Sequence, residues 1–392
     1  MEPILNLAVL LIAGLLFARV LGLLKFPDVT GYLIAGMIVG PSVLGLVPAE
    51  GVKTLEILSQ MALSFIAFSV GSEMNLKSIK KIGSKILVVT ICEALGAMLV
   101  VTLTMLLVFK TDVAFAITIG SIASATAPAA TLMVIRQYSA KGDLVDVLIP
   151  VVALDDAVCI MAFGVASSIA TAMLSGAALS MNTMLVKPVL EILMAIGVGL
   201  IGGIIYILIG KRVKNDGENL TFTLAMIFGI TAVAFRLNLS SLLTLMTSGI
   251  VIANFGRVNR RYLELINTIT PPLFVAFFVL SGADLNLAGL KSVGVLGIAY
   301  VFARVLGKMG GAFISTKVTG FPKSVQNFLG LTLVPQAGVA IGLSLIASNI
   351  IPDPHGSQIR TVVLGATIIY ELIGPLVAKF ALTEAGCIER GK

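Results

Sequence analysis

Charged residues are scarce in this sequence. Lysine, arginine, aspartate and glutamate make up only 12% of the 392 residues, whereas apolar residues make up 58%, and the mean hydropathy is +1.07. Soluble domains are about one quarter charged and roughly half apolar. The composition therefore excludes an ordinary soluble protein and predicts a polytopic membrane protein.

Residues that often carry metals, disulfides or acid–base chemistry are also rare. The chain has three cysteines, one histidine and no tryptophan. The cysteines are isolated, so we expect neither a disulfide nor a cysteine-based metal site. His355 lies in a loop between apolar runs, which argues against histidine as the main proton carrier. No nucleophile with a neighbouring base is apparent, so we expect neither an enzyme nor a bound cofactor.

Long apolar runs, by contrast, are abundant. A helix needs about 20 apolar residues to cross a bilayer, and only a helix pairs its own backbone groups in lipid. We therefore predict an all-α protein with about thirteen transmembrane helices. The candidate runs are residues 4–24, 30–48, 55–73, 85–108, 113–134, 144–173, 186–209, 219–235, 239–255, 265–283, 290–315, 325–348 and 359–383.

Lysine and arginine are distributed unevenly among the loops between these runs. Most of them follow odd-numbered runs, for example at Lys80, Lys81, Lys211, Arg212 and Arg261. Because basic loops stay in the cytoplasm, we expect the N-terminus outside the cell and the C-terminus inside. Basic loops that face anionic lipid also explain the net charge of +7, so nucleic acid is not an expected partner.

Two pairs of segments indicate an internal repeat. FIAFSVGSEMNL at 65–76 is similar to FVAFFVLSGADLNL at 274–287, at an offset of 211 residues, and Pro128 and Pro335 interrupt two apolar runs 207 residues apart. An odd number of spans separates the paired segments, so the two copies have opposite orientations, as in secondary transporters. We predict two crossed, proline-broken helices, the second of which carries Gln336 beside its proline.

Six charged residues fall well inside the apolar runs, where a central charge costs at least about 2.5 kcal/mol and therefore marks a functional candidate. Asp155 and Asp156 are adjacent on their helix, so one can face a structural partner and the other an aqueous cavity. Their carboxylates repel each other and suit small alkali cations, which favours a site where a proton and a cation compete. A helix–helix salt bridge is the alternative. The six residues are Glu93, Asp155, Asp156, Arg304, Lys308 and Glu371.

The repeat offset also links Arg304 with Glu93. Subtracting 211 from 304 gives position 93, so the two residues occupy equivalent places in the two copies. We predict a buried ion pair between them, with Asp155 as a competing partner of the arginine. Lys308 lies one turn further along the same face, where it either extends towards the membrane surface or joins this network.

Four motifs follow one another along the chain: FPDVTGYLIAGMIVGPSVLGLV at 26–47, GSE at 71–73, TAP at 126–128 and the adjacent aspartates. In their order and spacing they resemble the cation:proton antiporter superfamily, in particular the bacterial NapA-like sodium/proton antiporters, over essentially the whole chain. The resemblance implies that Asp156 is the Na+ ligand, that Asp155 is its partner in the site, and that the Thr126 hydroxyl takes part. Ser124 is a further candidate ligand nearby.

The same resemblance implies an NhaA/NapA-like architecture. Residues 1–83 and 211–288 would form a scaffold and dimerisation domain, residues 84–174 and 289–392 a core ion-transport domain, and residues 175–210 a linker helix. The expected protein is a homodimer in a prokaryotic plasma membrane, with anionic lipid at the dimer interface. Its core would carry the ion by an elevator-type movement against the scaffold.

One departure from the family bears on stoichiometry. NapA-like proteins have an intramembrane lysine at the position of Arg304, and a guanidinium, unlike a buried lysine, does not lose its proton. We therefore expect electroneutral exchange of one proton for one Na+ or Li+, unless Lys308 takes the place of the family lysine. The alternatives are K+/H+ exchange, Na+-coupled symport of an organic acid, and a channel or sensor that no longer transports.

Overall fold

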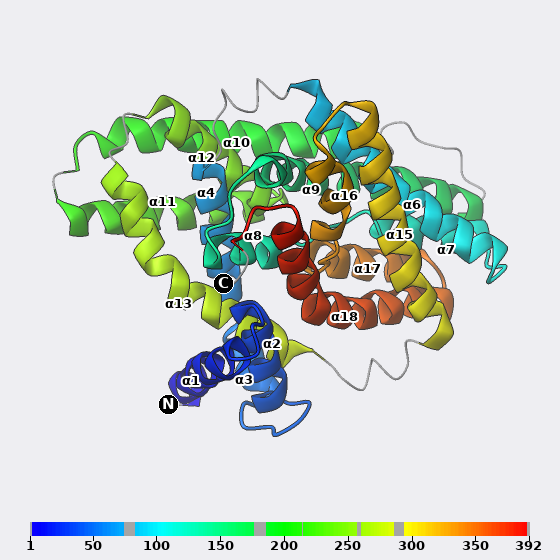
Figure 1. Ribbon diagram of the computed structural model, residues 1–392, viewed down its shortest axis with the longest axis horizontal. Coiled ribbons are helices and arrows are strands. Elements are labelled where there is room, and N and C mark those ends of the chain that lie inside the picture. Colours follow the sequence, from blue (N-terminus) through cyan, green and yellow to red (C-terminus); the bar gives the residue numbers. More distant parts are fainter. Residues whose placement is uncertain are drawn as a thin grey trace. The chain divides into compact units, whose positions relative to one another are not determined.

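The computed structural model describes residues 2–73, 83–175, 186–213, 215–256, 260–285 and 294–389. Across these ranges the regular elements are helices and no strand occurs, which confirms the all-α prediction. Figure 1 shows these helices, coloured along the chain.

The helices belong to two compact units. Unit 1 comprises residues 1–17, 32–83 and 189–284, and therefore includes most of the expected linker helix. Its helices are α1 (Glu2–Gly22), α2 (Asp28–Val39), α3 (Ala49–Thr54), α4 (Glu56–Glu73), α10 (Lys187–Gly210), α11 (Asp216–Arg236), α12 (Ser241–Phe255) and α13 (Arg260–Asp284), of which α1, α2 and α10 extend partly into unit 2.

Unit 2 comprises residues 18–31, 84–188 and 285–392. It contains all six charged residues that the sequence analysis located inside apolar runs. Its helices are α6 (Ser84–Leu107), α7 (Val113–Ile122), α8 (Pro128–Gln137), α9 (Asp143–Ser175), α15 (Gly294–Val318), α16 (Lys323–Thr332), α17 (Gly338–Ile350) and α18 (His355–Glu384).

Within the described ranges, six helices are long and apolar enough to cross a membrane, and six shorter apolar helices accompany them. Interruption at the prolines explains why α7 and α17 are short. The number of thirteen spans stays a prediction. The six long helices are Glu2–Gly22, Ser84–Leu107, Val189–Gly210, Gly217–Arg236, Gly294–Val318 and His355–Glu384.

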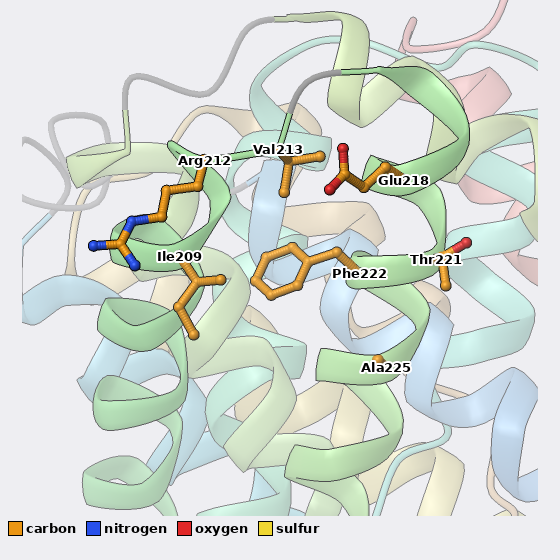
Figure 2. Close-up of a pocket in the computed structure, with 7 residues that line it drawn as sticks. All are labelled: Ile209, Arg212, Val213, Glu218, Thr221, Phe222 and Ala225. Atoms are coloured by element: carbon orange, nitrogen blue, oxygen red, sulfur yellow. The ribbon is translucent and has the colours of Figure 1, made fainter.

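An open pocket of unit 1 lies where α10 ends and α11 begins, with a volume of about 430 Å³. Figure 2 shows the Phe222 ring directed towards Ile209 across the gap. Its lining includes one carboxylate, that of Glu218, and not the adjacent acids on which the ion-site hypothesis depends. The lining residues are Ile209, Arg212, Val213, Glu218, Thr221, Phe222 and Ala225.

The two proline-broken helices of unit 2 meet at their breaks. Residues 123–127 separate α7 from α8, and residues 333–337 separate α16 from α17. Pro128 is the first residue of α8, a position where its missing N–H removes no helical hydrogen bond. The N–H of Ala127 donates to the carbonyl of Pro335 at 2.8 Å, and the amide of Gln336 donates to the carbonyl of Ile122 at 3.0 Å.

Arg304 of α15 occupies the junction between the two breaks. Its fully buried guanidinium donates to the carbonyl oxygens of Ala123 (2.9 Å), Ala125 (2.6 Å) and Val334 (2.6 Å), and it lies 4.6 Å from the centre of the Tyr370 ring. Carbonyls at the C-terminal end of a helix lack helical donors and carry partial negative charge. One arginine therefore satisfies the ends of α7 and α16 together.

Glycines bring α6 and α15 into direct backbone contact. A Cβ at Gly307 would lie 2.6 Å from the carbonyl oxygen of Gly96, and one at Gly311 would overlap the carbonyl oxygen of Cys92. These close approaches fix the register of α15 against α6. They therefore determine which side chains of the two helices face each other.

Replacing Gly311 with alanine is expected to push α15 away from α6 and to lower the free energy of unfolding by about 1–3 kcal/mol, as overpacking does. Gly310→Ala is the matched control, because a Cβ at Gly310 meets nothing within 4 Å. Its higher helix propensity should leave stability unchanged or raise it by up to about 1 kcal/mol. Thermal unfolding of both purified variants measures the difference, and equal stability would contradict the close packing.

Arg304→Lys is expected to destabilise the protein by about 3 kcal/mol or more. A lysine keeps the charge but loses the planar fork that reaches both helix ends, and hydrogen bonds to charged groups contribute about 1.5–3 kcal/mol each. Arg236→Lys, at the exposed end of α11, is the control and should change stability by less than about 0.5 kcal/mol. If both variants unfold at the same temperature, Arg304 does not hold the junction.

Candidate functional site

Asp155 and Asp156 lie in the interior of α9 and are both buried, with 0% and 8% of their surfaces exposed. Consecutive helical residues project about 100° apart, so the two carboxylates cannot share all their neighbours. Asp155 Oδ2 accepts a hydrogen bond from Lys308 Nζ at 3.4 Å. Among the described residues, Asp156 forms no ion pair. Asp155 therefore has an ionic partner, whereas Asp156 has none in the described part of the chain.

Glu93 pairs with Lys308, and the predicted Glu93–Arg304 ion pair is wrong. Lys308 Nζ lies 2.6 Å from Glu93 Oε2, and both side chains are fully buried. Arg304 and Lys308 are one helical turn apart, so both are on the α15 face that packs towards the site. Arg304 is committed to the carbonyls of the helix breaks, whereas the contacts at Gly307 and Gly311 bring Glu93 opposite Lys308.

Lys308 also contacts Asp155, the residue that the sequence analysis gave as a competing partner of Arg304. The ammonium bridges Glu93 on α6 and Asp155 on α9, so three helices meet at one buried cation. The offset of the repeat predicted that α6 and α15 meet. It placed the contact with Glu93 at Arg304, whereas the contact is made one turn further along α15, at Lys308.

Several buried acceptor atoms of this region have no hydrogen-bond partner within the described part of the chain. They are Glu93 Oε1, Thr126 Oγ1, Asp155 Oδ1 and Asp156 Oδ1. Leaving a buried polar atom unpaired costs about 1–3 kcal/mol, so these atoms indicate a site that binds an ion or a proton. Carboxylate and hydroxyl oxygens are ligands for hard cations, and a carboxylate also takes a proton.

A cation here would need more than carboxylates. In the ranges that the structure describes, no three His, Cys, Asp or Glu side chains are grouped to hold a metal ion. Thr126 belongs to the unwound segment between α7 and α8, where backbone carbonyls are also free of helical hydrogen bonds. Carboxylate, hydroxyl and carbonyl oxygens are the donor types that suit an alkali cation.

The other predicted residues help to build the junction. Ser124 Oγ donates to the carbonyl of Ser121 at 2.6 Å, so its hydrogen is committed to the end of α7. Gln336 receives a hydrogen bond from Tyr300 at 3.2 Å while its amide donates to Ile122. Both side chains thereby tie the broken segments to neighbouring helices.

Sequence reasoning missed two tyrosines that support Arg304. Tyr300 is one turn before Arg304 on α15 and reaches Gln336, and Tyr370 on α18 packs on the guanidinium while its hydroxyl donates to Val301 O at 3.0 Å. The spacing of four residues between Tyr300 and Arg304 was a readable signal, because it puts both on one helix face. Nothing in the sequence pointed to Tyr370.

Comparison with known proteins found similar antiporters. The high-affinity Na+/H+ antiporter NhaS3 of Synechocystis sp. is 21% identical over 386 residues, covering 86% of this chain and 81% of that protein. Cation/H+ antiporter 19 of Arabidopsis thaliana is 33% identical over 96 residues, covering 22% of this chain and 12% of that protein. The sodium proton antiporter MjNhaP1 of Methanocaldococcus jannaschii, in its structure at pH 8, has a similar fold, with a TM-score of 0.72 and 19% identity over 99% of both chains.

The family model for the transmembrane sodium/hydrogen exchanger matches residues 7–384, which is almost the whole sequence. The resemblance to the cation:proton antiporter superfamily is thereby confirmed, and the helix breaks, the buried aspartates and the paired lysine lie within the matched range. This chain belongs to the sodium/hydrogen exchanger family.

Proposed function

We propose that this protein exchanges Na+ or Li+ for H+ across the membrane, with the cation and the proton competing for Asp155 and Asp156. The observation that carries the proposal is the pair of adjacent, buried carboxylates on α9 whose Oδ1 atoms have no donor among the described residues. Family membership and the similarity to NhaS3, a high-affinity Na+/H+ antiporter, support it.

Asp156 is proposed as the main cation ligand because it forms no ion pair in the described part of the chain. A proton on Asp156 neutralises the carboxylate and removes its attraction for a cation, whereas a bound Na+ excludes the proton. Thr126 and Asp155 would contribute further oxygens. The same oxygens also suit K+, so K+/H+ exchange is kept as the second candidate, and few polar side chains remain for an organic substrate.

Alternating access is proposed to follow the elevator scheme implied by the family. The core would consist of residues 84–174 and 289–392, and the scaffold of residues 1–83 and 211–288. The compactness of unit 2, which groups 84–188 with 285–392, supports treating the core as one moving body. Neutralisation of the site by either ion would lower the cost of moving it through the membrane.

The protein is further proposed to be a homodimer of a prokaryotic plasma membrane, with its N-terminus outside and anionic lipid at the dimer interface. The family and the uneven distribution of basic loops support this assignment.

The stoichiometry depends on Lys308. Our expectation of electroneutral exchange was based on the replacement of the family lysine by Arg304. The contact of Lys308 with Asp155 at 3.4 Å supports the alternative that Lys308 takes the place of the family lysine. One proton per cation now requires that Lys308 keep its proton throughout the cycle.

Asp156→Asn is expected to abolish cation-driven proton movement, because the amide neither binds a proton nor carries the charge that attracts Na+. Proton flux into or out of proteoliposomes after addition of Na+, Li+ or K+ measures this. Asp146→Asn, an exposed aspartate in the first turn of the same helix, is the matched control and should retain wild-type exchange. Full activity in Asp156→Asn, or no cation-driven proton movement in the wild type, would contradict the proposal.

A further inference from the structure

The loop between α1 and α2 packs with unit 2, although most of both helices belong to unit 1. Residues 18–31, which include the end of α1 and the start of α2, are grouped with unit 2, whereas residues 1–17 and 32–83 are grouped with unit 1. The same loop contains the first residues of the motif at 26–47, which the proposed ion site does not use. It is therefore a part of unit 2 that the chain ties to unit 1 at both ends.

Lys379 of α18 holds this loop by its backbone. At the end of α1 the N–H of Phe26 donates to the carbonyl of Leu21 at 3.1 Å, and Lys25 adopts a left-handed conformation with a φ of 61°. The carbonyl of Lys25 accepts a hydrogen bond from Lys379 Nζ at 2.7 Å. The same ammonium donates to the hydroxyl of Tyr138 at 2.9 Å and lies 4.3 Å from the centre of its ring. One cation therefore joins the loop, α18 and the C-terminal end of α8.

Gln137, the last residue of α8, makes a second attachment. Its Oε1 accepts a hydrogen bond at 2.9 Å from the N–H of Asp28, the first residue of α2, where N–H groups have no partner within the helix. At its other end α8 begins with Pro128, two residues after Thr126. The helix that holds the loop at one end therefore carries the unwound segment of the proposed site at the other.

The boundaries between the units fall inside helices and not in flexible chain. The boundary after residue 17 lies within α1, and the boundary after residue 31 lies within α2. Sharp helix kinks occur at proline, at pairs of glycine and serine, or at π-bulges, and the continuous α-helical stretch LLFARVL at 15–21 has none of these. Because α1 has no hinge at the boundary, a displacement of unit 2 against unit 1 must pull the loop away from α8 and α18.

We propose that residues 23–28 form a latch, which is docked on α8 and α18 in one end state of the transport cycle and detaches so that unit 2 can move. This inference rests on the proposed function and adds the contacts that must break in its elevator movement. The three hydrogen bonds suit this task because they are exposed or only partly buried, so water replaces them when the loop leaves. The docked latch stabilises the end state that the structure shows.

The first test is to fasten the latch reversibly. Asp28→Cys and Gln137→Cys put a thiol on each side of the second attachment, in a protein that also carries Cys92→Ser and Cys387→Ser, while Cys159 is fully buried and stays. The purified protein is joined with a bis-methanethiosulfonate cross-linker and reconstituted in proteoliposomes. Na+-driven proton flux is expected to be lost on cross-linking and to return after reduction with dithiothreitol.

The matched control joins two helices of unit 2 without the loop. Tyr138→Cys and Lys379→Cys, in the same background, link α8 to α18 at the point where the native side chains already touch. Both helices move with unit 2 in the proposed cycle, so this cross-link should leave the flux as it was before the reagent was added. Mass spectrometry of both variants verifies that the cross-links have formed.

A second measurement weakens the latch instead of fastening it. Lys379→Met keeps an unbranched side chain but removes the ammonium and with it the hydrogen bond to the loop. Because a hydrogen bond from a charged group contributes about 1.5–3 kcal/mol, amide hydrogen exchange at residues 18–31 should become at least about tenfold faster. Lys323→Met, at an exposed lysine in the first turn of α16, is the control and should leave this exchange unchanged.

Three results would overturn the inference. Full proton flux in the cross-linked Asp28→Cys/Gln137→Cys variant would mean that the loop stays with unit 2 throughout the cycle. Loss of flux in the cross-linked control would mean that the reagent blocks a movement inside unit 2 and not the release of the latch. Unchanged amide exchange in Lys379→Met would mean that this lysine does not hold the loop. Failure of the proposed function is distinct, because then even the wild type would not exchange a cation for protons.

Discussion

The contact on which the rest of unit 2 depends is that between Arg304 and the carbonyls of the two broken helices. Breaking a helix inside a membrane exposes backbone groups where no water can pair them, at a cost of several kcal/mol each. Arg304 satisfies carbonyls from both breaks with one planar cation, and Tyr370 covers its face. The unwound segment that carries Thr126 can exist in the buried interior because this cation pairs its carbonyls.

The charged groups of unit 2 thus divide into two sets with different tasks. Arg304 is paired with backbone dipoles and has a structural task, whereas Lys308, Glu93 and Asp155 form an ionic group beside Asp156. An arginine suits the first task because its fork reaches several carbonyls and its charge is permanent. A lysine in the second set is a point charge that carboxylates on two other helices can share.

Much of this arrangement could be predicted from the sequence, and the remainder could not for identifiable reasons. The scarcity of charge made Asp155 and Asp156 conspicuous, and the prolines at 128 and 335 indicated the helix breaks, because both signals are local. The partner of Glu93 was mistaken because Arg304 and Lys308 lie one turn apart on the same face. Only the close approach at Gly307 and Gly311 decides between them, and that is a property of the packed pair of helices. Tyr370 could not have been chosen, since its role depends on how α18 packs against α15.

The proposed exchange requires a site that binds either ion but neither too tightly. Asp156 is buried without an ion-pair partner in the described residues, so it gains from a proton and from a cation alike. In the proposed exchange the two occupants exclude each other, so the affinity for Na+ is expected to follow the proton concentration.

The most direct measurement of that central claim is the dissociation constant for Na+ of the purified wild-type protein, determined by calorimetric titration from acidic to alkaline pH. Competition for one carboxylate predicts that binding weakens as pH falls, by about tenfold per pH unit once the site is mostly protonated. A dissociation constant that does not change with pH would show that Na+ and the proton bind independently, and exchange by competition at Asp156 would then be wrong.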